Sequence, residues 1–309
     1  MGEASISTEK PVASPARGRL CVLMTCFNRR EITLRCLEAF ERDQGLAQLA
    51  GVMVDDGSRD GTAEAVRERF PWMQVEVNTG EPLFWCRGMH RALQIALTRG
   101  YDNYLLLNDD TVLEPGAITG MLSCAESLRR SEGHPVLVCG STRDALSGLW
   151  TYGGERQRSR WRPVNPVPVP PGDVPQRLDT FNGNVVLLPV DVVERLGNLD
   201  PVFEHAMGDT DYGLRATRAG VGVWLAPGYQ GQCSVNAVAG TFRDLALSPR
   251  QRWRLMLGRK GLPWRSWAHF TRRHAGILWP AYFVWPYLRL LSTMAAQRIR
   301  GRNGPAGRA

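Results

Sequence analysis

The sequence lacks any C-x-x-C pair, although it contains seven cysteines. An odd number of scattered cysteines argues against a disulfide framework. Cys21 and Cys139 lie inside apolar runs, which is typical of reduced core thiols. The pattern therefore predicts a cytoplasmic protein whose stability comes from an ordinary hydrophobic core.

Long apolar segments are also missing. Residues 1–18 are rich in Ser, Ala and Pro and lack the apolar core of a signal peptide, so we expect a disordered tail. Residues 275–288 carry no charge, but this stretch is too short to span a bilayer and contains Pro280 and Pro286. No internal repeat is visible. These absences exclude a secreted, a membrane-spanning and a repeat protein as the simplest interpretations.

The chain has 309 residues, of which 43% are hydrophobic and 22% charged, as in ordinary globular proteins. Its formal charge of +8 is uneven. From Arg243 to the end there are 14 Lys and Arg residues against one acid, and the remainder has 24 bases and 29 acids. A basic C-terminal part on a near-neutral body favours contact with an anionic partner, either nucleic acid or a phospholipid surface.

Strand-like and helix-like segments alternate from residue 20 to residue 142. We expect strands at 20–26, 51–54, 73–77, 104–107 and 136–139, and helices at 31–42, 63–70, 88–98 and 118–130. Alternation of this kind predicts an α/β fold with a mostly parallel sheet covered by helices on both faces. The Pro- and Arg-rich segment 154–176 is expected to be irregular, followed by a strand at 181–188, helices at 190–196 and 209–219, and a helical region from 248 onward.

Acidic residues follow the apolar strand at 104–107 at once, in the order Asn108, Asp109, Asp110. Two neighbouring carboxylates repel each other, so this pair favours a positive partner such as a divalent cation carrying phosphate. The alternative is that Asp110 caps a helix opened by Pro115.

Two more strand ends carry polar groups. The first expected strand leads into Thr25-Cys26-Phe27-Asn28-Arg29, and the second ends in Val54-Asp55-Asp56-Gly57-Ser58. Because parallel strands present their carboxyl ends at one edge, these loops are expected to converge on one crevice. The G-x-G-x-x-G fingerprint is absent, which argues against a nicotinamide enzyme. The sequence favours a nucleotide–metal site.

These motifs, together with Asp60-Gly61-Thr62 and Gly208-Asp209-Thr210-Asp211-Tyr212, resemble the family 2 inverting glycosyltransferases of GT-A fold over roughly residues 20–230. Segments 83–89 and 208–213 resemble bacterial polysaccharide enzymes, including rhamnosyltransferases. The resemblance implies a nucleotide-diphosphate sugar as donor and Mg²⁺ or Mn²⁺ as cofactor. The acceptor would be a glycan or lipid-linked hydroxyl in surface polysaccharide synthesis.

The resemblance also implies roles for individual residues. Thr25, Phe27 and Asn28 would lie at the nucleotide, with Asp56 binding the base. Asn108 and Asp109 would contribute to the donor site, and Asp110 would bind the metal. Asn108 stands where the family usually has the first acid of its D-x-D motif.

An inverting transfer needs a carboxylate to take the proton of the acceptor hydroxyl, and the resemblance assigns this role to Asp209. Asp211 is the alternative base, because both residues open the same expected helix, where the dipole favours a carboxylate. The alternative is that one of these acids is merely the N-cap of that helix, a role that suits Asp211 or Thr210 better than Asp209.

The C-terminal part is expected to be a basic amphipathic helical appendage of residues 241–309, after a catalytic domain of residues 19–240. Aromatic residues in 275–288, flanked by Arg272, Arg273, Arg289, Arg298, Arg300 and Arg302, favour a helix lying on the inner face of the cell membrane. A packed cap or a dimer contact is the alternative.

Three rival functions stay open. A nucleotidyltransferase would need a Gly-rich basic loop after the first strand, and residues 25–29 contain no glycine. A non-catalytic nucleic-acid-binding protein would use the basic C-terminal part, although we expect no nucleic-acid partner. A degenerate glycan-binding protein is the third, because of Asn108.

Overall fold

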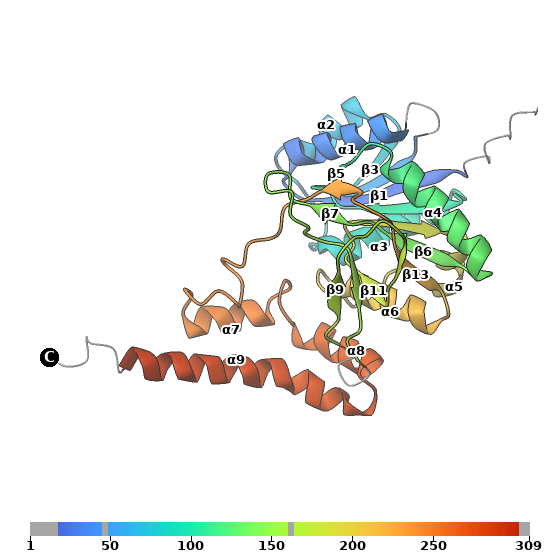
Figure 1. The fold of residues 1–309 in the computed structure, drawn as a ribbon. Helices are drawn as coiled ribbons and strands as arrows, with labels where there is room; N and C mark the ends of the chain where they lie inside the picture. The colour runs from blue at the N-terminus through green and yellow to red at the C-terminus, as the bar shows by residue number, and fades with distance from the viewer. Residues whose placement is uncertain (1–17, 45–48, 160–163, 303–309) are drawn as a thin grey trace, which may run out of the picture.

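The computed structural model describes residues 18–44, 49–159 and 164–302. Its centre is an eight-stranded sheet that confirms the expected mostly parallel α/β architecture (Figure 1). Strands β1 to β4 are parallel, and β12 runs antiparallel between β4 and β6. The sheet order is β10 (Gln176–Arg177), β13 (Gly222–Leu225), β6 (Val136–Cys139), β12 (Val185–Pro189), β4 (Asn103–Leu107), β1 (Leu20–Cys26), β2 (Gly51–Asp55) and β3 (Met73–Val77).

Helices cover both faces of this sheet, because its strands are apolar on both sides. In β1, Leu23 packs into one buried cluster and Met24 into the other. One face is covered by α1 (Arg30–Gln44), α2 (Thr62–Arg69) and α4 (Ala117–Glu132). The other is covered by α3 (Phe84–Leu97), α5 (Val190–Leu196) and α6 (Gly208–Arg218). All seven cysteines are unpaired and six are buried, as the sequence predicts.

The strand order creates a topological switch point between β1 and β4 at one edge of the sheet. From β1 the chain proceeds to β2 and β3, and then returns to β4 on the opposite side of β1. The loops that follow β1 and β4 therefore diverge from the carboxyl ends of adjacent strands. Open α/β sheets bind their ligands at such a switch point.

Most expected elements form within a few residues of their predicted bounds, and the exceptions have identifiable causes. The strand expected at 181–188 is divided into β11 (Thr180–Phe181) and β12, because Asn182-Gly183-Asn184 turn between them. The helix expected from Gly88 begins earlier, at Phe84. Segment 154–176 is less irregular than expected, since it contains β8 (Gly154–Arg156) and β9 (Val167–Val169), which form a small sheet with β11.

The alternative role of Asp110 as a helix cap is wrong. Helix α4 begins at Ala117, and the carboxylate of Asp43 in α1 accepts the amide hydrogens of Gly116 and Ile118 at its start. Asp110 lies before β5 (Val112–Leu113), which forms a second small sheet with β14 (Gly231–Gln232) and β7 (Thr142–Arg143). The acid pair is therefore free of a capping role.

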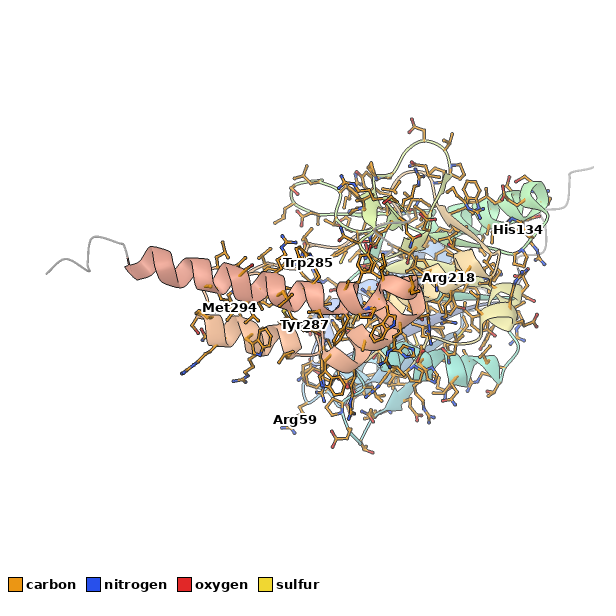
Figure 2. The ribbon with its side chains drawn as sticks, turned by 90° about the horizontal axis from the view of Figure 1, so that it is seen from below. Arg59, His134, Arg218, Trp285, Tyr287 and Met294 are labelled. Atoms are coloured by element: carbon orange, nitrogen blue, oxygen red, sulfur yellow. The ribbon has the colours of Figure 1, made fainter. Side chains whose placement is uncertain are left out.

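The C-terminal helices are α7 (Pro249–Leu257), α8 (Trp264–His274) and α9 (Trp279–Arg302), with a 3₁₀ turn at Gly276–Leu278. Figure 1 shows α9 beneath the α/β body, and Figure 2, seen from below, shows it in front of the body and projecting beyond it. Pro286 does not end α9. No helix in the described ranges is long and apolar enough to cross a bilayer. Residues 1–17 and the side chains of Arg298, Arg300 and Arg302 lie outside the described part.

A buried ion cluster fastens α8 to the α/β body. Asp211 on α6 is fully buried and bonds Arg215, Arg273 and His274 at 2.8 to 3.0 Å. Arg273 also pairs with Asp200 at 2.7 Å. Burial alone raises the pKa of Asp211, but the hydrogen bond from His274 and the two guanidinium charges outweigh it and lower the pKa. Arg273 is thus an internal partner and not a flanking membrane contact.

We expect Asp211→Asn to lower the free energy of unfolding by about 3 kcal/mol, because it leaves the partly buried guanidinium groups of Arg215 and Arg273 without the counter-charge of a buried carboxylate. Since the folded pKa of Asp211 is depressed, its stabilisation exists above the unfolded pKa and is lost as pH falls through the folded value, so the difference shrinks below about pH 4. Denaturant unfolding measures both effects. Glu76→Gln, in the exposed pair with Arg91, is the control and should cost less than about 1 kcal/mol.

Candidate functional site

Arg29 joins the loops that follow β1 and β4 across the crevice. Its guanidinium lies 3.1 Å from Asp109 and 2.7 Å from Asp110, so one cation neutralises half of a paired negative charge. The Asp109 side chain is only 10% exposed. Burial raises the pKa of Asp109 to about 6, and Arg29 opposes this rise less than burial favours it. The two predicted acids therefore form one electronegative cluster with the guanidinium beside it.

The predicted loop residues after β1 and β2 are bonded to one another. Asn28, in a left-handed conformation (φ 51°), donates its backbone N–H to Ser58, and its side-chain oxygen accepts the N–H of Arg59. The carboxylate of Asp56 accepts from Asn78 and from the backbone N–H groups of Leu83 and Phe84, at 2.7 to 2.8 Å. A carboxylate has about four acceptor positions, so one remains for a ligand.

The other two residues predicted at the nucleotide differ in exposure. Phe27 is 55% exposed at the end of β1, and its ring is available for stacking. Thr25 is buried, its hydroxyl donates to the Val54 carbonyl at 3.0 Å, and its side chain packs against Gly88. Thr25 therefore supports the pocket from within the sheet instead of presenting its hydroxyl.

Trp85 connects the acid cluster with Asp209. Its indole N–H donates to the side-chain oxygen of Asn108 at 2.6 Å. The part of the ring next to this N–H lies so close to Gly183 that a Cβ there would meet Cζ2 at 2.4 Å. Gly183 in turn donates its N–H to Asp209 at 3.0 Å. One edge of the Trp85 ring thus contacts both Asn108, after β4, and the glycine that bonds the carboxylate of Asp209.

Asp209 lies in a setting suited to proton transfer. It is in the first turn of α6, where its carboxylate also accepts the N–H of Thr210 at 2.8 Å. Burial raises its pKa, and the two backbone N–H groups only partly oppose this. Glu155 on β8 feels the charge of Asp209, and burial followed by that charge raises the pKa of Glu155 to about 7. Perturbed carboxyl groups of this kind are typical of functional sites.

Asp211, the alternative base, is separated from this setting. Its buried carboxylate is enclosed by Arg215, Arg273 and His274. A carboxylate engaged by two guanidinium groups and an imidazole, with a lowered pKa, is a poor proton acceptor for a substrate.

Sequence reasoning missed the roles of Arg29 and Cys233. Arg29 appears in the motif Phe27-Asn28-Arg29, but only the fold brings it to acids 80 residues away. The thiol of Cys233, after β14, lies 3.5 Å from Asp110 and accepts a hydrogen bond from Asn184 at 3.4 Å. Burial and then the charge of Asp110 raise the pKa of Cys233 to about 12, so it is a neutral thiol. No pattern of spacing in the sequence predicts either contact.

The acid cluster suits a hard divalent cation that brings its own ligands. Within the described residues no group of three or more His, Cys, Asp or Glu side chains could hold a metal by itself. Asp109 and Asp110 offer carboxylate oxygens only, and Asn108 is engaged by Trp85. Magnesium is usually bound through one or two carboxylates together with water and substrate phosphates. The donor set therefore fits Mg²⁺ or Mn²⁺ when a diphosphate completes it.

The sequence from residue 16 to residue 258 matches the family model described as "Glycosyltransferase like family 2". No curated protein matches it. The fold is similar to a mannosyltransferase, PcManGT from Pyrobaculum calidifontis, solved with GDP-Man and Mn²⁺, with a TM-score of 0.52 and 18% identity over 94% of this chain and 76% of that one. It is also similar to GalNAc-T7, solved with UDP, GalNAc and Mn²⁺, with a TM-score of 0.52 and 12% identity over 79% of this chain and 48% of that one. The predicted GT-A-like fold is confirmed.

We expect Arg29→Met to lower the free energy of unfolding by about 1 kcal/mol at about pH 7.5, because both acids lose their cation in a partly exposed pair. Because the pKa of Asp109 is raised in the folded state, the folded protein holds a proton on Asp109 that the unfolded chain has already lost, so stability falls as pH rises from about 4 to 6. Without Arg29 the pKa of Asp109 rises further. The loss measured by denaturant unfolding should therefore be smaller at about pH 5.

Arg30→Met is the matched control, because the neighbouring Arg30 pairs only with exposed Glu31 at 3.8 Å. An equal loss in both variants, or a loss independent of pH, would contradict the expected repulsion between Asp109 and Asp110.

Proposed function

Because the chain belongs to the glycosyltransferase like family 2, we propose that it transfers a sugar from a nucleotide-diphosphate sugar to an acceptor hydroxyl with inversion. The observation that carries this proposal is the bridge formed by Trp85. One edge of the ring contacts Asn108, which precedes the acid pair, and Gly183, which bonds Asp209. A donor bound at the acids would thus share this tryptophan with a base.

The donor half of the site is supported by the switch-point crevice. We propose that Phe27 stacks on the base, that the remaining acceptor position of Asp56 binds it, and that Asn28 holds the loop which carries both. Asp109 and Asp110 would face the ribose and diphosphate. Two solved proteins of similar fold contain Mn²⁺ with nucleotide ligands, which is consistent with this arrangement.

Asp110 and Asp109 would hold the divalent cation. When bound, that cation would stabilise the charge that develops on the departing diphosphate. Arg29 lies beside the same acids and could move from them to the diphosphate, since a guanidinium suits a phosphate group as well as a carboxylate. The two acids would then exchange one positive partner for another.

Asp209 would act as the base. Its carboxylate takes the proton of the acceptor hydroxyl while the acceptor oxygen forms a bond to the anomeric carbon, and the bond from that carbon to the diphosphate oxygen breaks. The amides of Gly183 and Thr210 hold the carboxylate in place. Attack from the face opposite the leaving group gives inversion. The raised pKa of Asp209 makes it a stronger base than an exposed aspartate.

Family membership disfavours the three rival functions named from the sequence, because each lacks sugar transfer. The acceptor remains a proposal. We propose a glycan or lipid-linked hydroxyl in bacterial surface polysaccharide synthesis, and a hexose such as rhamnose as the transferred sugar, on the basis of the motifs at 83–89 and 208–213. The division into a catalytic domain of residues 19–240 and a helical appendage of residues 241–309 is likewise proposed.

We expect two aspartate variants to separate binding from turnover. Calorimetry against a panel of nucleotide sugars should detect donor binding that requires Mn²⁺ or Mg²⁺. Asp110→Ala should abolish this metal dependence, whereas Asp209→Asn should keep it and lower turnover by about 10²- to 10⁴-fold. Glu76→Gln, far from both acids in the sequence and on the surface pair with Arg91, is the control. Full turnover by Asp209→Asn would exclude it as the base.

We also propose that the C-terminal helices touch the inner face of the membrane. Apolar side chains are exposed on the 3₁₀ turn and on α9, where Ile277 is 93% exposed and Leu288 and Leu291 are about half exposed. On α9, the spacings of four and three residues keep Val284, Leu288 and Leu291 on one helix face. Nearby Arg272 is exposed and carries a charge suited to anionic lipid.

Sedimentation with vesicles tests this contact. The protein should bind phosphatidylglycerol vesicles, and the double variant Ile277→Ser, Leu288→Ser should bind roughly tenfold more weakly, because it removes exposed apolar area. Leu146→Ser, at a 98% exposed position outside the C-terminal helices, is the matched control. Equal binding of the double variant and the parent protein would favour a packed cap or a dimer contact.

A further inference from the structure

A cavity of about 1410 Å³ lies between the α/β body and the C-terminal helices. It is larger than the pockets that hold drug-sized ligands. Its wall includes Thr210, which follows Asp209 in the chain, and Glu155, whose charge couples to Asp209. None of the acids after β2 or β4 lines it. The cavity therefore approaches the proposed base from the side that the donor does not use.

Helix α9 gives the cavity its length. The cavity is lined by α9 at intervals of four residues, by Ala281, Trp285, Arg289 and Thr293. The next residues in the chain, Tyr282, Pro286 and Leu290, also line it. Twelve residues of α-helix extend over about 18 Å. The stacked rings of Trp267 and Phe270 on α8 form another part of the wall, with centroids 5.7 Å apart. The result is a long apolar channel.

The charged residues that line the cavity are mostly basic. Among the described residues that line the cavity, Glu155 is the acid, whereas Arg243, Arg252 and Arg289 are basic. Arg252 is buried and bonds the Phe242 carbonyl at 2.9 Å, so it supports the wall. Arg243 and Arg289 are exposed and can reach an anionic group. A ligand that is apolar along its length and anionic at one position would satisfy both features.

The wall also opens toward the face that we propose contacts the membrane. Trp285 lines the cavity and is nevertheless 64% exposed, and Ile277 and Leu288 are exposed on the same turn and helix. In Figure 2 the labelled Trp285 lies on the part of α9 beside the α/β body. A chain anchored in a lipid surface could therefore enter without crossing polar protein.

We infer that this cavity binds the acceptor, and that the acceptor is an amphipathic lipid whose hydrocarbon chain lies along α9 and whose phosphate or diphosphate linker meets Arg289 and Arg243. The inference rests on the proposed sugar transfer. It places the hydroxyl-bearing end of the acceptor at Thr210 and Glu155, next to Asp209. The hydroxyl proton goes to Asp209, as in the proposed reaction.

Binding of farnesyl diphosphate to the full chain tests the inference. Calorimetry, with tryptophan fluorescence as a second readout for Trp267 and Trp285, should show that it binds at least about tenfold more tightly than farnesol or inorganic diphosphate. Ala281→Trp, which narrows the channel, and Arg289→Glu, which reverses the linker charge, should each weaken binding by about tenfold or more.

Two matched controls should leave binding unchanged. Ser292→Trp adds the same ring to α9, and Arg254→Glu makes the same charge reversal on α7, and neither position lines the cavity. Equal weakening by the controls and the cavity variants overturns the inference. So does equal binding of farnesyl diphosphate and inorganic diphosphate, a preference for a lipid-free oligosaccharide, or a dimer that Ala281→Trp dissociates.

Donor binding separates this inference from the proposed function. Metal-dependent binding of a nucleotide sugar should persist in Ala281→Trp and Arg289→Glu. If the donor binds but farnesyl diphosphate does not, the acceptor inference alone fails. If no nucleotide sugar binds to the parent protein, the proposed function fails.

Discussion

Repulsion between Asp109 and Asp110 is the constraint on which the rest of the site depends. Two adjacent carboxylates at the end of a buried strand are stable only beside positive charge, and Arg29 provides it in the free protein. The strand order brings Arg29 there, because β1 and β4 are neighbours although the chain visits β2 and β3 between them. The same topology opens the crevice in which a diphosphate would be held. The strand order therefore determines which cation lies beside the two acids at this edge of the sheet.

Much of the fold could be predicted from the sequence because hydrophobic periodicity is a local property. Strands such as β3 and β6 form where the apolar runs are, and the motif at Asn108-Asp109-Asp110 correctly indicated the edge that carries the acids. The contacts of Arg29 with acids 80 residues away, and of Asp110 with Cys233, depend on strand order, which periodicity does not encode. The proposed choice of Asp209 over Asp211 likewise depends on α8, because the docked helix adds Arg273 and His274 to the pair that Asp211 forms with Arg215.

Asn108 illustrates how a departure from a motif can have a structural reason. An acid at this position would add a third negative charge to a cluster that Arg29 already balances incompletely. The amide oxygen of Asn108 instead accepts the indole N–H of Trp85 at 2.6 Å, which fixes the ring against Gly183. Since Gly183 also bonds Asp209, the amide of Asn108 supports the position of the proposed base through Trp85.

Asp209 and Asp211 are two residues apart on α6, and the second fastens α8 to the body. The helix that carries the proposed base is therefore the same helix to which α8 is attached. Such a wall cannot be exchanged between related chains as an independent module, because a foreign helix would have to supply the counter-charges of Asp211. We therefore expect substitutions along the lining of α9 to change the proposed acceptor preference, whereas Arg273 and His274 must stay because they attach α8 to Asp211.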